Sequence, residues 1–222
     1  MGLIHALNAL LGRYVSKDEL ANQAIHVEQE VIRESVGSQD QVSAAFGGFN
    51  HVKFRRDGAF EVAPVILPRE RQAELHRHLM LCFTGLSRYS SEVAKSTIDN
   101  LGSREPELKR MGAMVDEAIR ILASPSTPIA EFGKLLNESW HHKRNLSDKV
   151  STSAIDQLYE TARSAGAIGG KLMGAGGGGF MLLFVPPELQ SKVRSRLAKL
   201  VHVPFEFESD GSRVVLYQPN GL

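Results

Sequence analysis

The stretch GGKLMGAGGGGFMLLFV, residues Gly169 to Val185, is dense in glycine and then continues as an unbroken apolar run. Gly174, Gly176 and Gly179 match the G-x-G-x-x-G spacing of dinucleotide-binding loops, but such a loop must open a helix. The residues FMLLFVP that follow are apolar and end in proline, so they predict a strand. No Gly-Lys-Ser/Thr follows the glycines, which also excludes a Walker A loop. The stretch therefore predicts a glycine-rich connection between two strands.

Two functions of this connection stay open. A plain hairpin needs one or two glycines, whereas the run Gly176 to Gly179 has four, which raises the entropy lost on folding. The alternative is an anion site, because successive glycine N–H groups can curl into a concave nest and Lys171 would add positive charge. The second interpretation predicts a phosphate ligand, and the first predicts none.

The pattern around the loop predicts an α+β fold. Residues 78–85 predict a buried strand, and a helix opened by Pro186 and two further strands are expected after the loop. Four helices are expected at residues 90–101, 105–123, 129–143 and 153–165. This order fits helices packed on an antiparallel sheet, rather than the regular alternation of a doubly wound fold.

The first part of the chain has a pattern of its own. Helical periodicity predicts helices over residues 3–11 and 16–33. Ser38 and Gln41 predict a capping box at the start of a further short helix. An Asp-Gly turn then predicts a hairpin over residues 50–67.

Composition limits the class of protein. A chain of 222 residues with 42% apolar composition can bury one large core or two modest ones. The net charge is +1 and no segment gathers basic charge, so we expect no nucleic acid partner, and no segment is apolar enough to predict a membrane partner. The single cysteine, Cys82, lies in an apolar run, which predicts a buried thiol and a reduced compartment, the cytoplasm.

Two carboxylates each have two interpretations. Glu28 falls at the margin of the apolar face of its helix, where it either pairs with a basic side chain or binds Mg²⁺, which prefers oxygen ligands. Asp40 follows Ser38 in the first turn of a helix, where an acid interacts favourably with the helix dipole. Its alternative role is to orient a substrate hydroxyl during phosphoryl transfer, with Gly37 letting the ligand approach closely.

Four segments, in order and spacing, resemble the GHMP family of small-molecule kinases, which includes galactokinase, homoserine kinase, mevalonate kinase and phosphomevalonate kinase. The segments are HVEQEVIRESVGSQDQVSAAFGGFN, LCFTGLSRYSSEV, ESWHHKRNLS and GAIGGKLMGAGGGGFMLLFV. Within the family they are most similar to the branch that contains D-glycero-D-manno-heptose 7-phosphate kinase. The resemblance implies a GHMP kinase-like α+β fold, with residues 1–72 as the remnant of a ribosomal-S5-like domain and residues 73–222 as a ferredoxin-like C-terminal domain. The charged segment 68–77 would hold the boundary between them.

The resemblance also implies roles for individual residues. Asp40 becomes the catalytic aspartate and Glu28 the magnesium-binding glutamate, while Gly37 and Arg88 contact the sugar phosphate. An exposed arginine at the start of a helix is an equal alternative for Arg88. The nucleotide phosphates would lie against Lys171, Gly174, Ala175, Gly176, Gly177, Gly178 and Gly179. ATP and Mg²⁺ are the implied cofactors, and Lys143 is implied to face the site.

By the same resemblance, the chain matches only about the last two thirds of a family member and lacks the loop that cradles the ATP phosphates in the family. We therefore expect a sugar-phosphate kinase, or its C-terminal portion, that transfers the γ-phosphoryl group to a hydroxyl of a sugar phosphate such as heptose 7-phosphate. The alternatives are a non-catalytic binding or assembly module and a galactokinase-like kinase. Exposed apolar surface would favour a homo-oligomer or association with an N-terminal segment.

Overall fold

The computed structural model describes residues 1–87 and 89–218, which form two compact units. The first unit combines residues 1–65 with the C-terminal residues from 207 onward, and the second spans residues 66–206. The sequence had suggested a boundary at residues 68–77, with the whole C-terminus in the second domain. The described C-terminal residues join the first unit instead because they pack on one of its helices.

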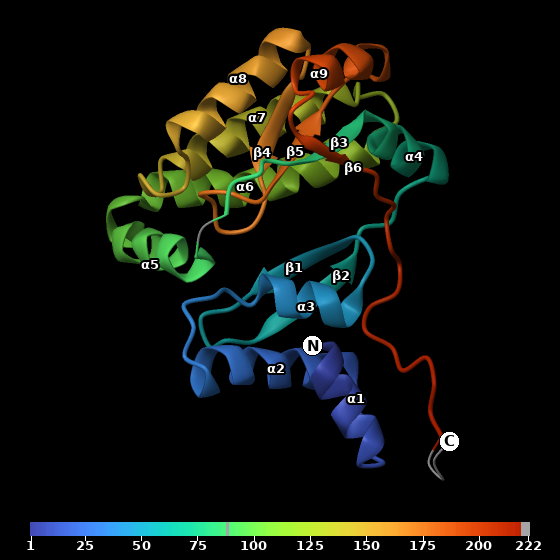
Figure 1. The fold of residues 1–222 in the computed structure, drawn as a ribbon. Helices are drawn as coiled ribbons and strands as arrows, with labels where there is room; N and C mark the ends of the chain where they lie inside the picture. Colours follow the sequence, from blue (N-terminus) through green and yellow to red (C-terminus); the bar gives the residue numbers. More distant parts are fainter. Residues whose placement is uncertain (88, 219–222) are drawn as a thin grey trace. The chain divides into compact units, whose positions relative to one another are not determined.

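The first unit contains three α-helices, a π-helical turn and one hairpin among its described residues. They are α1 (Gly2–Leu10), α2 (Lys17–His26), η1 (Val27–Val31), α3 (Gln39–Phe46), β1 (Asn50–Phe54) and β2 (Phe60–Pro64). Strands β1 and β2 pair antiparallel, which confirms the hairpin expected from the Asp-Gly turn (Figure 1). A capping box of Ser16 and Glu19 starts α2. The core between the helices and the hairpin is built on Ala21, Val42 and Ala45.

The C-terminal segment packs on the end of α3. The Ser212 N–H donates to the Ala44 carbonyl at 2.8 Å, and the Gly48 N–H donates to the Glu208 carbonyl at 3.0 Å. Gly47, at φ +63°, has the backbone of Asp210 in the place of a Cβ, so a larger residue does not fit there. The strand predicted at the very end of the chain is wrong, since residues 204–218 contain no strand.

The second unit is an antiparallel sheet with helices, as predicted. Its elements are α4 (Arg69–His78), β3 (Leu79–Phe83), α5 (Ser90–Asn100), η2 (Leu101–Ser103), α6 (Glu105–Ala123), α7 (Ala130–Arg144), α8 (Ser153–Ala165), β4 (Gly169–Leu172), β5 (Phe180–Phe184), η3 (Pro187–Leu189), α9 (Gln190–Arg196) and β6 (Val201–Val203). The strand order is β4-β5-β3-β6, and every neighbouring pair is antiparallel. This is the ferredoxin-like arrangement, with the first and third strands in the centre (Figure 1).

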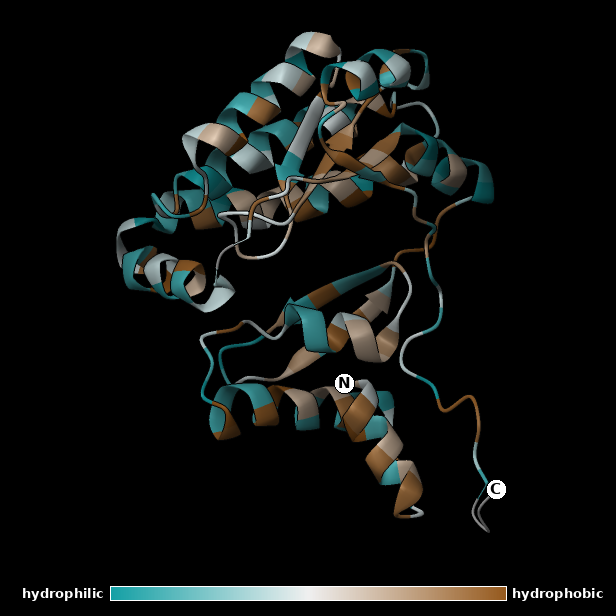
Figure 2. Ribbon diagram, viewed as in Figure 1, coloured by the Kyte–Doolittle hydropathy of each residue, from teal (hydrophilic) through white to brown (hydrophobic). Residues whose placement is uncertain are grey.

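Both faces of this sheet are packed. Met80 and Cys82 on β3 point into a cluster that includes residues of α8 and α9, whereas Leu79 and Phe184 belong to a second cluster with residues of α4, α6 and α7. The two sets alternate along the strands because successive side chains point to opposite faces. Strands β3 and β5 are accordingly apolar along most of their length (Figure 2). Cys82 is fully buried, as expected.

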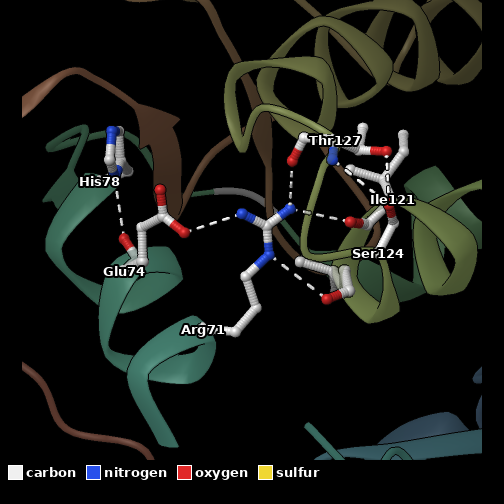
Figure 3. A network of polar contacts seen from close by, with 7 residues as sticks. Arg71, Glu74, His78, Ile121, Ser124 and Thr127 are labelled. Carbon is white, nitrogen blue, oxygen red and sulfur yellow. Dashed lines mark hydrogen bonds and ion pairs between the residues drawn. The ribbon is translucent and has the colours of Figure 1, made fainter. Parts of the chain in front are cut away.

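Helix α4 occupies most of the charged segment 68–77, in which the sequence had suggested a boundary. Arg71 explains why so charged a segment is ordered, because its guanidinium donates to the carbonyls of Ile121, Leu122 and Thr127 at 2.8–3.3 Å (Figure 3). These carbonyls lie at or just beyond the C-terminal end of α6, where the helix leaves acceptors without partners. Glu74 accepts from the same guanidinium at 2.7 Å. This contact is tertiary, so the composition of the segment does not reveal it.

No helix within residues 1–87 and 89–218 combines the length and apolarity that crossing a bilayer requires.

Candidate functional site

The glycine-rich stretch connects two strands, β4 and β5, and opens no helix, which confirms the exclusion of a dinucleotide fingerprint. Close packing explains two of its glycines. At Gly176, with φ +124°, a Cβ would lie 2.7 Å from the Val150 carbonyl oxygen, and at Gly178 a Cβ would lie 2.5 Å from the Leu86 carbonyl oxygen. The loop is therefore pressed against two other segments of backbone, and side chains are excluded there for that reason.

Those segments also take up part of the hydrogen-bonding capacity of the loop. The Gly177 N–H donates to the Val150 carbonyl and the Gly179 N–H donates to the Leu86 carbonyl, both at 2.8 Å. An anion nest along the whole run of glycines is therefore ruled out. Four N–H groups make no hydrogen bond to any residue that the structure describes, namely those of Gly174, Ala175, Gly176 and Gly178. These four remain as donors for an anion.

Two lysines flank the start of the loop. The Lys143 ammonium, from the last turn of α7, donates to the Leu172 carbonyl at 3.0 Å and the Gly174 carbonyl at 2.5 Å. Lys171, on β4, makes no hydrogen bond or ion pair with residues 1–87 or 89–218. Burial, and then the nearby charge of Lys171, lowers the pKa of Lys143 to about 7, although the two accepting carbonyls favour the charged form. Burial also lowers the pKa of Lys171. An anion would relieve the repulsion between these lysines.

In the first unit, Glu28 lies in the π-helical turn η1 that follows α2. Such turns are rare and are often found at functional sites. The Glu28 carboxylate accepts a 2.6 Å hydrogen bond from Nε2 of Gln41, and Gln41 is 4% exposed. The expected basic partner is absent among the described residues, where no ion pair of Glu28 occurs. The carboxylate is thus held by a neutral amide, and no described cation pairs with it, so it is available to another ligand.

The segment before α3 is held against the same turn. Nε2 of Gln29 donates to the Val36 carbonyl at 3.0 Å and to the Ser38 hydroxyl at 3.2 Å. The predicted capping box of Ser38 and Gln41 is wrong, because both side chains bond to η1 rather than to each other's backbone. These contacts bring the start of α3, which carries Asp40, to the turn that carries Glu28.

Asp40 and Gly37 both face solvent. Asp40 is exposed, and its carboxylate makes no hydrogen bond or ion pair with the part of the chain that is described. Gly37 has no atom within 4 Å of the position of a Cβ, which leaves open space for a ligand. Arg88, the remaining predicted substrate contact, lies outside the described residues. Asp40, Glu28 and Gly37 belong to the first unit, and the glycine loop belongs to the second.

The residues around Glu28 fit a magnesium ion whose ligands are mainly water and phosphate oxygens. Groups of three or more histidine, cysteine, aspartate or glutamate side chains that could hold a metal do not occur among the described residues. Glu28 nevertheless offers one carboxylate oxygen beside the buried, unpartnered Oε1 of Gln41. Mg²⁺ usually takes one or two carboxylates and completes its shell with water and phosphate oxygens, which such a site allows.

The comparison with protein families matches the part of the chain that contains the glycine loop and the two strands it connects. Residues 114–202 match the family model described as GHMP kinases C terminal. The chain therefore contains a GHMP kinase C-terminal domain.

Two relatives narrow the comparison. The chain is 34% identical over 196 residues to D-glycero-alpha-D-manno-heptose 7-phosphate kinase of Campylobacter jejuni, a match that covers 87% of this chain and 56% of that protein. It is 35% identical over 193 residues to mevalonate kinase of Pyrococcus horikoshii, covering 82% and 52%. The chain thus spans about half the length of the curated relatives it matches.

Solved structures agree on the fold. A D-glycero-D-manno-heptose 1-phosphate kinase from Bacteroides thetaiotaomicron superposes with a TM-score of 0.67 at 25% identity, covering 93% of this chain and 57% of that one. The mevalonate kinase of Methanococcus jannaschii superposes with a TM-score of 0.66, covering 89% and 58%. At 20% identity the second structure supports the fold alone.

Proposed function

We propose that the chain is an ATP-dependent sugar-phosphate kinase, or its C-terminal portion, that transfers the γ-phosphoryl group to a hydroxyl of a sugar phosphate. The observation that supports this best is the Gln41–Glu28 hydrogen bond, which ties the π-helical turn to the helix that carries Asp40. Phosphoryl transfer depends on positioning and on charge stabilisation, so a fixed carboxylate beside an exposed one suits it.

In this proposal each group has one role. Asp40 accepts a hydrogen bond from the acceptor hydroxyl or removes its proton, and Gly37 leaves room for the sugar. Glu28 holds Mg²⁺, which when bound neutralises charge on the phosphates. Lys171 and the free N–H groups of the loop from Gly174 to Gly178 bind phosphate oxygens. Lys143 fixes the start of that loop from α7.

The first test combines turnover and binding. ATP turnover is measured with D-glycero-D-manno-heptose 7-phosphate and, separately, with mevalonate, since both kinds of kinase are relatives. We expect turnover with the sugar phosphate and its loss in Asp40→Asn, by about 10²-fold or more. Asp18→Asn, an exposed acid on α2, is the matched control.

Magnesium-dependent nucleotide binding tests the second half of the proposal. Calorimetry with ATP, with and without Mg²⁺, is expected to show binding that Glu28→Gln weakens and Glu30→Gln leaves unchanged. Glu30 lies in the same turn and is exposed. If the chain showed no turnover and no magnesium-dependent binding, the kinase proposal would be contradicted and a non-catalytic binding module would be favoured.

A further inference from the structure

A cavity of about 550 Å³ lies in the second unit and shares no residue with the glycine loop. Its walls come from the end of α4, from β3, from the start of η3 and α9, and from residues 202–206. Nothing in the proposed kinase chemistry uses these residues. The cavity has the size of a small-molecule site.

Polar cross-links between the walls hold the cavity in shape. Nε2 of Gln190 donates to the Arg77 carbonyl at 2.6 Å, which joins α9 to α4. A ring nitrogen of His76 lies 2.8 Å from the Phe205 carbonyl, which joins α4 to the chain after β6. The cavity is thus lined by segments that are bonded to one another, so a ligand would meet a site that is already formed.

Two arginines of the lining carry positive charge with which no described residue forms an ion pair. Arg77 and Arg194 are among the lining residues, and their guanidinium groups form no hydrogen bond or ion pair with residues 1–87 or 89–218, unlike that of Arg71. Glu206, the acid of the lining, lies 3.7 Å from His76. Burial, followed by the charge of Arg194, lowers the pKa of His202, which disfavours its charged form. Arg77 and Arg194 thus carry charge with which no described residue forms an ion pair.

The remaining lining is apolar, with Leu79, Leu81 and Val203 from the two strands and Pro187 and Pro204 beside them. A ligand made only of a hydroxylated sugar would find few partners on such a surface, whereas the face of a nucleobase can pack on apolar side chains. We propose that this cavity binds a nucleoside monophosphate, whose phosphate contacts Arg77 and Arg194 and whose base packs on the apolar lining. Guanidinium groups suit this role because they donate paired hydrogen bonds to phosphate.

Nuclear magnetic resonance of the nitrogen-15-labelled chain tests the proposal, with adenosine monophosphate, ribose 5-phosphate and inorganic phosphate as probes. We expect adenosine monophosphate to shift the amides of residues 79–81 and the non-proline residues of 202–206. The other two probes are expected to bind at least about tenfold more weakly. The double variant Arg77→Gln/Arg194→Gln is expected to lose about tenfold or more in affinity. Arg69→Gln/Arg196→Gln, which removes the same charge from α4 and α9 outside this cavity, is expected to stay within about twofold.

Four results would overturn the proposal. The first is that these amides do not shift at about 10 mM adenosine monophosphate, which would mean that any binding is weaker than millimolar. The second is equal affinity in the two double variants. The third is a shift confined to residues 174–179, which would place the ligand on the glycine loop and leave the proposed kinase function standing. The fourth is equal binding of ribose 5-phosphate and adenosine monophosphate, which would show that the cavity does not recognise the base.

Discussion

The side-chain amide of Gln41 donates a 2.6 Å hydrogen bond to the Glu28 carboxylate and joins the first turn of α3 to the π-helical turn η1. The two residues are thirteen positions apart, and Gln41 is the direct neighbour of Asp40. A single neutral side chain therefore orients one proposed functional carboxylate and sits beside the other.

We expect Gln41→Leu to lower the free energy of unfolding by about 1–2 kcal/mol, because the half-buried Glu28 carboxylate loses its partner. Nucleotide binding is expected to need more Mg²⁺, because the carboxylate is no longer held in one orientation. Urea unfolding and a magnesium titration measure the two effects. Gln39→Leu, an exposed position at the start of α3, is the control, and equal behaviour of the two variants would contradict the role of Gln41.

Arg71→Met is expected to destabilise the chain by about 2–4 kcal/mol, because it leaves three carbonyls at the end of α6 without their donor. The Arg71 side chain is only 10% exposed, so water does not easily replace it. Arg69→Met, on the exposed side of α4, is expected to change stability by about 0.5 kcal/mol or less. A thermal or urea unfolding curve decides, and matching losses in the two variants would show that Arg71 does not anchor α4.

Glycine substitutions separate packing from flexibility in the loop. Gly178→Ala is expected to cost about 1–3 kcal/mol, because its Cβ would lie 2.5 Å from the Leu86 carbonyl oxygen. Gly112→Ala, inside α6 with no atom within 4 Å, is expected to stabilise the chain by about 0.5–1 kcal/mol. Urea unfolding of both variants measures the change in the free energy of unfolding. No loss of stability in Gly178→Ala would refute the close packing of the loop.

The pKa of Lys143 predicts how stability depends on pH. This pKa falls from 10.5 to about 7 in the folded chain, so between these values the unfolded state binds one more proton than the folded state. Stability contributed by this group is therefore lowest below about pH 7 and rises as the pH increases toward 10. We expect the wild type to gain stability over this window relative to Lys143→Met, as measured by urea unfolding at several pH values. Parallel profiles would contradict the lowered pKa.

The lowered pKa values of Lys143 and Lys171 predict that the chain takes up protons when it binds an anion. A bound phosphate raises the pKa of Lys143 and Lys171, so nucleotide affinity is expected to fall as the pH rises above about 7. Calorimetry in buffers of different ionisation enthalpy measures the protons taken up. Lys171→Met should reduce this uptake, whereas Lys134→Met, an exposed lysine on α7, should not. Binding independent of pH would argue against a phosphate at this end of the loop.

Helix α1 predicts self-association. Leu3 and Leu10 are 72% and 79% exposed, and none of the residues of α1 is buried. Much of this helix is hydrophobic (Figure 2). Exposed apolar surface of this kind favours association with another protein surface. We expect the purified chain to sediment as a dimer or larger species and Leu3→Lys/Leu10→Lys to shift it toward monomer. A wild type that is monomeric at high concentration would contradict this expectation.

Local patterns predicted most elements because the forces that set them are local. The helices from Glu105 to Ala123 and from Ser153 to Ala165 were expected at their observed bounds, since periodic apolar residues and nearby breakers define them. The final strand and the capping box at Ser38 were wrong because the competing contacts come from residues distant in sequence. Lys143 was expected at the site only through the family resemblance, because no local pattern marks a lysine that donates to a loop 29 residues later.

By itself the sequence determined the antiparallel sheet with helices and the strand after the glycine loop, because hydrophobic periodicity does not depend on tertiary contacts. Its ordered motifs gave the resemblance to the GHMP kinases, and through it the ferredoxin-like domain. Only the tertiary structure decided which glycine N–H groups are free, that Gln41 holds Glu28 and that Arg71 orders α4. Each of these depends on a donor meeting an acceptor from a distant part of the chain. A buried polar group takes whichever partner the fold brings to it, and the sequence alone does not specify that partner.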